Sequence, residues 1–129
     1  MSELEPTLLL VDDSEVNLDM LSRRLQRKGF IVLTASSGQA ALDIVAKQPV
    51  DLVVLDLMMP EMDGWTFMAE FKKLPAYSSI PIVVVSQAGN RVLASAPVAA
   101  GYLSKPLDRR TLLETIELCL LRRRRDSEA

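Results

Sequence analysis

Five polar side chains stand at the ends of short apolar runs, and their types suit phosphoryl chemistry. Asp12 and Asp13 follow the first run, Asp56 the third, Ser86 the fourth and Lys105 a weaker fifth. If these runs are parallel strands, the residues meet at the carboxyl edge of the sheet, where open α/β folds bind ligands. The sequence therefore predicts a site with three carboxylates, one hydroxyl and one ammonium group.

Three carboxylates gathered at one edge repel one another. A like-charge pair at ~4 Å costs about 1 kcal/mol in water and roughly 4 kcal/mol at an effective dielectric constant near 20. A hard cation that prefers oxygen ligands, such as Mg²⁺, would neutralise them. Lys105 can pair with a phosphoryl oxygen, and the Ser86 hydroxyl can donate to one. Asp56, at the end of a central apolar strand, is the expected nucleophile.

Composition excludes several other chemistries. The 129 residues hold one cysteine, Cys119, and no histidine, which excludes an internal disulfide, histidine-based nucleophilic catalysis and the usual zinc sites. The 15 basic and 17 acidic residues are too balanced for a nucleic-acid binder, although residues 122–125 form an arginine run. No apolar run reaches the roughly 18 residues of a membrane span. We expect one cytoplasmic domain that binds neither nucleic acid nor membrane.

The elements that must position the polar residues alternate along the chain. Several apolar runs are continuous, as is typical of strands covered on both faces; the five runs are 7–11, 30–33, 52–55, 80–85 and 101–104. Helical stripes lie between or after them, formed by Leu18, Leu21 and Leu25, by Ala41, Ile44 and Val45, by Trp65, Met68 and Phe71, and by Leu112, Leu113, Ile116 and Leu120. This (βα)5 pattern predicts a parallel α/β sheet with helices on both faces.

Local signals set the expected boundaries. Ser14 and Ser37 are placed to cap the first two helices, and Gly29 stands where the first should end. The segment 87–100 is rich in small residues and contains Pro97, which predicts a shortened or irregular fourth helix. We expect an N-terminal extension over 1–6, the domain over 7–121 and a charged tail over 122–129.

The motifs together resemble the receiver domain of two-component response regulators. The matching pieces are Val11-Asp12-Asp13, the run from Leu55 to Gly64, the Ser86 position and Leu103-Ser104-Lys105-Pro106. The resemblance implies a flavodoxin-like fold of strand order 2-1-3-4-5. It also implies a phosphoacceptor rather than an enzyme, with Asp56 taking a phosphoryl group from a histidine kinase or a histidine phosphotransfer protein.

The resemblance further implies roles for the neighbouring residues. Asp13 and Asp56 would bind Mg²⁺ together with the backbone carbonyl of Met58, and Asp12 would act largely through water. Lys105 would hold the phosphoryl group. Ser86 would move toward that group and let Tyr102 turn inward, which would switch a downstream protein or an attached domain. Pairing of two copies as a homodimer stays open.

Two departures from the family pattern bear on the switch. Gln87 stands where the family usually has a small residue, and the segment from Ser86 to Lys105 is a few residues shorter than is common. One alternative is a degenerate receiver that binds a partner without phosphorylation. Another is a phosphatase with an aspartate nucleophile of the haloacid dehalogenase type, but that class needs an acid where Met58 stands. The receiver either acts alone or is part of a longer chain.

Overall fold

The architecture is an open parallel sheet between two layers of helices. The computed structural model describes residues 5–56, 63–77, 79–86, 101–104 and 108–128. Its strands are β1 (Thr7–Val11), β2 (Ile31–Ala35), β3 (Leu52–Asp56), β4 (Ile82–Ser86) and β5 (Gly101–Ser104). Its helices are α1 (Glu15–Arg27), α2 (Gly38–Lys47), α3 (Asp63–Lys73), a short 3-10 helix (Pro75–Tyr77) and α5 (Arg109–Glu128).

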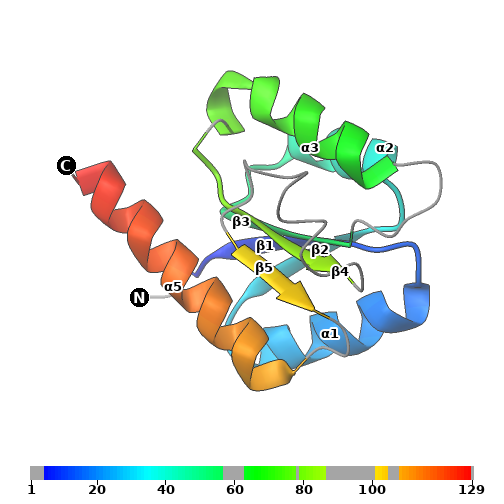
Figure 1. Ribbon diagram of the computed structural model, residues 1–129, viewed down its shortest axis with the longest axis vertical. Coiled ribbons are helices and arrows are strands. Elements are labelled where there is room, and N and C mark those ends of the chain that lie inside the picture. Colours follow the sequence, from blue (N-terminus) through cyan, green and yellow to red (C-terminus); the bar gives the residue numbers. More distant parts are fainter. Residues whose placement is uncertain (1–4, 57–62, 78, 87–100, 105–107, 129) are drawn as a thin grey trace.

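All strand pairs are parallel, and the spatial order is β2-β1-β3-β4-β5. Figure 1 shows α2 and α3 on one face of the sheet and α1 and α5 on the other. The predicted flavodoxin-like fold and its strand order are therefore confirmed. No described helix is both long enough and apolar enough to span a bilayer.

The continuous apolar runs are explained by burial on both faces. Alternate residues of β1 and β3 point into opposite cores: Leu9 and Val53 face α2 and α3, whereas Leu8 and Leu52 face α1 and α5. β2 lies at the edge of the sheet, and its Ile31 is 46% exposed. The interior strands β1, β3 and β4 are therefore the best covered strands of the sheet.

The two cores differ in composition. The core under α2 and α3 stacks Phe67 on Phe71 at a centroid distance of 5.3 Å, and Phe71 on Tyr77 at 4.8 Å. The Tyr77 hydroxyl lies 2.9 Å from the carbonyl oxygen of Val45 and 3.2 Å from that of Gln48, which ties the end of α2 to the chain after α3. The described core under α1 and α5 is aliphatic apart from the buried Cys119 and the half-buried Phe30 that packs against it.

Helix ends follow the local signals. The Ser14 Oγ accepts a hydrogen bond from the Asn17 amide at 3.3 Å, and the Ser37 Oγ accepts one from the Ala40 amide at 3.1 Å. α1 ends just before Gly29, whose φ of 99° suits a residue without a side chain. These three predictions are confirmed, and the first cap starts α1 directly after the Asp12-Asp13 pair.

Two predicted strands begin later than expected. β2 starts at Ile31 and β4 at Ile82, rather than at residues 30 and 80. Pro81 explains the second difference, because proline has no amide hydrogen to donate to a strand ladder, although its carbonyl accepts from the Val53 amide at 3.0 Å. The expected fourth helix within 87–100 lies outside the described residues.

Candidate functional site

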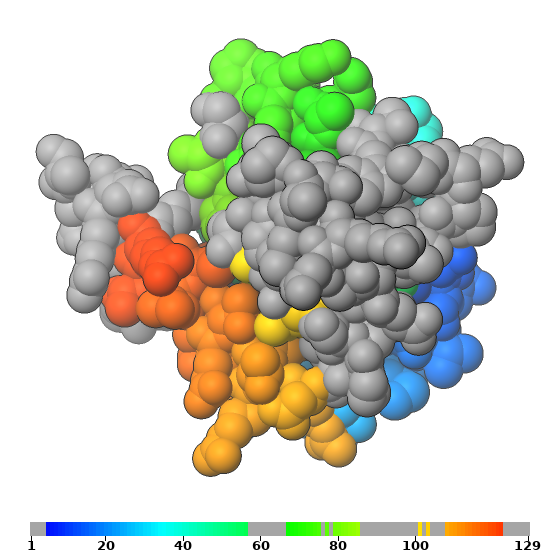
Figure 2. Space-filling view, in the orientation of Figure 1, coloured from blue at the N-terminus to red at the C-terminus, as the bar shows by residue number. Residues whose placement is uncertain are grey.

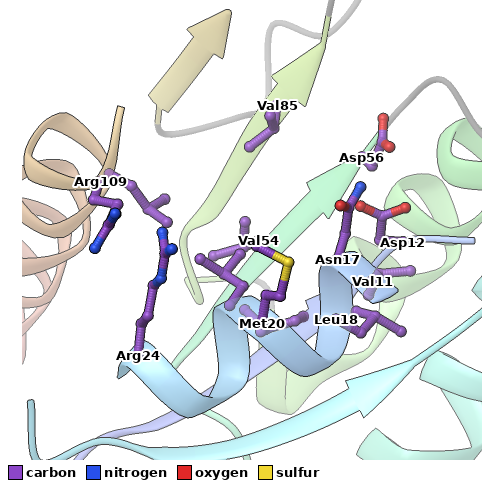
Figure 3. Close-up of a pocket in the computed structure, with 13 residues that line it drawn as sticks. Val11, Asp12, Asn17, Leu18, Met20, Arg24, Val54, Asp56, Val85 and Arg109 are labelled. Carbon is purple, nitrogen blue, oxygen red and sulfur yellow. The ribbon is translucent and has the colours of Figure 1, made fainter. Parts of the chain in front are cut away.

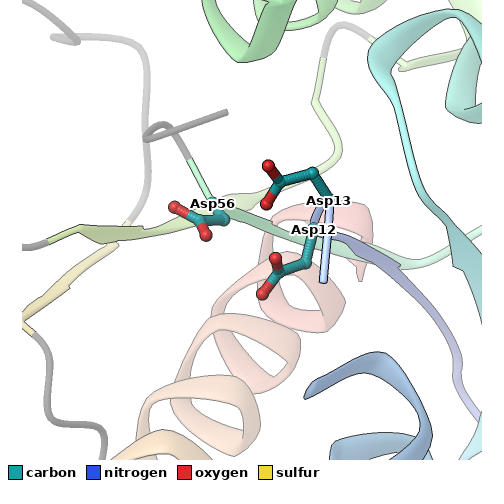
Figure 4. A group of neighbouring side chains, drawn as sticks. All are labelled: Asp12, Asp13 and Asp56. Atoms are coloured by element: carbon teal, nitrogen blue, oxygen red, sulfur yellow. The ribbon is translucent and has the colours of Figure 1, made fainter. Parts of the chain in front are cut away.

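Three carboxylates meet at the carboxyl edge of the sheet. One side-chain oxygen each from Asp12, Asp13 and Asp56 lies within 4.8 Å of the other two. Figure 4 shows the three side chains grouped where β1 and β3 end. The parallel register pairs Val11 with Leu55, so the next residues, Asp12 after β1 and Asp56 at the end of β3, lie side by side. The structure thus brings together the three acids that the sequence singles out.

The three acids differ in exposure. Asp56 is 5% exposed and is the one charged side chain that is buried among the described residues, whereas Asp12 is half-buried and Asp13 is exposed. At 4.8 Å, two negative charges repel by roughly 1 kcal/mol in water and about 3.5 kcal/mol at an effective dielectric constant near 20. Burial of Asp56 therefore places this repulsion where water screens it least.

Hydrogen bonds hold the loop of residues 12–14, which joins β1 to α1. The Asp12 Oδ1 accepts a hydrogen bond from the Ser14 amide at 2.9 Å, and the Asp12 amide donates to the Ala35 carbonyl at 3.1 Å. The first bond fixes the carboxylate beside the start of α1, whose positive dipole end favours negative charge. The second attaches the loop to β2. The Asp12 carboxylate is thus positioned by contacts with two neighbouring elements.

The donor set fits a hard divalent cation. Carboxylate oxygens from two strand ends are the ligand type that such cations prefer, and three protein ligands leave coordination positions for water or a phosphoryl oxygen. A cation there would also relieve the repulsion among the acids. The chemistry of the carboxylate oxygens and their separation both favour binding of a divalent cation at this edge.

A cavity of about 610 Å³ extends from the acids along α1 toward α5. Asp12 and Asp56 line one end, and Arg24 and Arg109 line the other, as Figure 3 shows. Apolar side chains form much of the wall between them, including Leu10, Val54 and Leu112. Sequence reasoning missed both arginines, because nothing local indicates that α1 and the start of α5 share a cavity.

Of the other predicted site residues, the structure describes only the backbone of Ser86 and Tyr102. The backbone of Ser86 ends β4 one residue after Val85, which pairs with Asp56, so Ser86 lies at the same edge of the sheet. Tyr102 lies within β5. The side chains of Ser86 and Tyr102, and Met58 and Lys105 altogether, lie outside the part that the structure describes.

Comparisons with known proteins agree with this geometry. A family model described as the response regulator receiver domain matches residues 8–117. The transcriptional regulatory protein GlrR of Escherichia coli is 37% identical over 120 residues, which are 91% of this chain and 27% of GlrR. Protein PilH of Pseudomonas aeruginosa is 32% identical over 88% of this chain and 96% of its own length.

A comparison with a solved structure supports the same family. The chemotaxis response regulator CheY4 of Vibrio cholerae superposes with a TM-score of 0.82 at 31% identity, over 89% of this chain and 98% of CheY4. The relatives also differ in length. This chain spans about a quarter of GlrR and of the response regulator PleD of Caulobacter vibrioides, but nearly all of PilH.

Proposed function

The chain belongs to the response regulator receiver domain family of two-component signal transduction, and from that premise we propose that Asp56 is its phosphoacceptor. The observation that carries this proposal is the position of Asp56: it is 5% exposed, ends β3 and lies within 4.8 Å of two further carboxylates. A nucleophile held at the end of a buried strand is fixed in orientation, and the neighbouring acids supply the ligands for a charge-neutralising cation.

The reaction is a transfer of one phosphoryl group. A carboxylate oxygen of Asp56 forms a bond to phosphorus while the bond from phosphorus to the donor nitrogen or oxygen breaks, and the donor leaves with that electron pair. The negative charge of the transferred group accumulates beside Asp12 and Asp13. Positive charge at this edge is therefore required for transfer.

We assign that charge to Mg²⁺, held by Asp13 and Asp56, with Asp12 acting through water. When bound, the ion supplies electrostatic stabilisation of the phosphoryl oxygens. By the family resemblance, the carbonyl of Met58 is a further ligand and Lys105 pairs with the phosphoryl group. The same resemblance assigns the switch to Ser86 and Tyr102.

The donor in this proposal is a histidine kinase or a histidine phosphotransfer protein in the cytoplasm. The product is a conformational state of the receiver that a downstream protein or an attached domain reads. GlrR is a transcriptional regulatory protein, but this chain corresponds to only about a quarter of its length. The similarity therefore supports the receiver step and leaves the output of this chain unassigned.

Intact-mass spectrometry tests the proposal. After incubation with Mg²⁺ and acetyl phosphate, the wild-type chain should gain the mass of one phosphoryl group, and Asp56→Asn should gain none. Asp43→Asn is the matched control, because Asp43 is an exposed aspartate on α2. Modification that persists in Asp56→Asn would move the acceptor elsewhere. No modification of the wild-type chain would favour a degenerate receiver.

A further inference from the structure

A second pocket of about 600 Å³ forms a basic groove between the later part of α1 and the start of α5. Its cations are Arg24, Arg27 and Lys28 on one side and Arg109 and Arg110 on the other. Its apolar lining consists of Leu21, Leu25, Leu112 and Leu113. In the space-filling view the first turns of α5, in orange, lie beside α1, in blue (Figure 2). We call this pocket the basic groove.

The basic groove concentrates positive charge on a chain whose formal net charge is −2. The ion pairs of Arg23 with Asp19 and of Lys73 with Glu70 do not use a cation of the groove. Asp108 is an acid that directly precedes Arg109. Hydrogen bonds from Thr111 hold the pKa of Asp108 below its usual range, and the charges of Arg110 and Arg109 add to this effect. The described lining of the groove thus holds five cations and no carboxylate.

Helix stability explains only part of this arrangement. Arg24 and Arg27 lie in the last turn of α1, where cations complement the negative end of the helix dipole. Arg109 and Arg110 lie in the first turn of α5, where the dipole end is positive and cations are unfavourable. Figure 3 shows the guanidinium groups of Arg24 and Arg109 near each other. The groove is thus a place of positive potential that an anionic partner would stabilise.

We propose that the basic groove binds an acidic amphipathic helix of a partner protein. The partner's apolar stripe would lie on the half-buried Leu21 and Leu113, with the buried Leu25 and Leu112 beneath them, and its Asp and Glu residues would pair with the cations of both rims. The cations are spread along the rims: Arg24 and Lys28 are separated by about 6 Å of helix rise. Such spreading, with an apolar floor between, suits an extended acidic helix better than one small anion.

The basic groove adjoins the phosphoacceptor cavity. Leu21, Arg24, Arg109 and Leu112 line both pockets. A helix in the groove would therefore contact residues that also form the wall of the cavity at Asp56. Arg27, Lys28 and Arg110 line the groove and not that cavity, so they can be changed without touching the proposed phosphoryl site.

Fluorescence anisotropy with a synthetic peptide tests the proposal. The probe is a labelled helix of about sixteen residues with leucines at i, i+3, i+4 and i+7 flanked by glutamates, and its control carries glutamine at every glutamate. We expect at least tenfold tighter binding of the glutamate peptide, with a Kd that rises as salt is added. Asp108→Asn should tighten binding, because asparagine still caps α5 and one negative charge is removed.

Charge reversal locates the binding site. The double variant Arg27→Glu with Arg110→Glu should weaken binding at least tenfold. Lys47→Glu should weaken it less than twofold, since Lys47 is an exposed cation in the last turn of α2, on the other face of the sheet. Equal affinity for the two peptides, an equal effect of Lys47→Glu, or competition by stoichiometric pyrophosphate would overturn the proposal.

Two further measurements distinguish loss of peptide binding from misfolding of the variant and from an error in the phosphoacceptor assignment. Phosphorylation of the double variant by acetyl phosphate should equal that of the wild-type chain. If the double variant does not fold, chemical-shift mapping on the wild-type chain replaces it. Amide shifts confined to residues 21–28 and 108–113 support the basic groove, and shifts centred elsewhere contradict it.

Discussion

The acid cluster at the carboxyl edge and the basic groove lie toward opposite ends of one cavity and hold opposite charge. The acid cluster places three carboxylates within 4.8 Å and buries one of them, Asp56. The basic groove spreads five cations over two helices, and four of them are exposed while Arg24 is half-buried. Both are groups of like charge, and they differ in spacing and in exposure to water.

This difference decides what each group can bind. Like charges in water at such distances repel by about 1 kcal/mol, and at the effective dielectric constant of a buried site by several times more. The acid cluster therefore needs a compact countercharge close to Asp56. The basic groove is stable in water without one, and its extended shape fits an extended partner. Burial and spacing, more than net charge, distinguish an ion site from a docking surface.

Removal of the cation should have the largest effect. In excess EDTA, phosphorylation by acetyl phosphate should slow by about a thousandfold, because a bound metal contributes several kcal/mol of charge stabilisation in the transition state. Asp13→Ala should slow it even when Mg²⁺ is present. Quench-flow with intact-mass detection measures both rates. An unchanged rate in EDTA would mean that the acid cluster works without a cation.

Mg²⁺ should also stabilise the folded domain. At a concentration a hundredfold above its Kd, the ion should raise the free energy of unfolding by about 2.7 kcal/mol. Asp13→Ala should lose most of this gain, and Asp43→Asn should keep it. Urea titration of the three chains with and without Mg²⁺ gives the six values. The same stability with and without Mg²⁺ in the wild-type chain would count against the cation site.

Without metal, the acid cluster should destabilise the domain. Asp56→Asn should raise the free energy of unfolding by about 1 kcal/mol or more, because it removes the buried member of the repelling group. Asp43→Asn, at an exposed position, should change it little. Urea titration in EDTA measures the difference. A lower stability of Asp56→Asn would show that the favourable interactions of the Asp56 charge in the folded state outweigh its repulsion by Asp12 and Asp13.

Substitutions in the basic groove should have the smallest effect on the free energy of unfolding. Arg27→Gln and Arg110→Gln should each change the free energy of unfolding by less than about 0.5 kcal/mol, because both side chains are exposed. Arg110→Gln should lie on the stabilising side, since it removes a cation from the first turn of α5. Thermal or urea unfolding is sufficient. A loss above 1 kcal/mol would mean that the substituted arginine has a specific partner within the fold.

The sequence was sufficient to predict those features that depend on a few consecutive residues. Continuous apolar runs predicted the strands, Ser14 and Ser37 predicted two caps, and the rule that ligands bind at the carboxyl edge predicted that Asp12, Asp13 and Asp56 meet. Each inference needed only a few consecutive residues and the parallel order of the strands. The topology then supplied the distances.

Sequence was insufficient where packing between distant helices decides the outcome. From the sequence alone, Arg24 is expected at an exposed position of α1, and Arg109 is expected at the start of α5. Only the packing of α1 and α5 on the same face of the sheet makes them neighbours. The exposure of Ile31 was equally hidden, because it depends on β2 being the edge strand rather than on its own apolar sequence.

The central position of β1 has a consequence for hydrogen exchange. β1 lies between β2 and β3, and the Asp12 amide at its end donates to the Ala35 carbonyl. These amides can exchange with solvent only when strands on both sides separate, which approaches complete unfolding of the domain. A cation bound at the acid cluster should therefore slow exchange by a similar factor across β1 and β3, which both have neighbours on two sides, and not only next to the carboxylates.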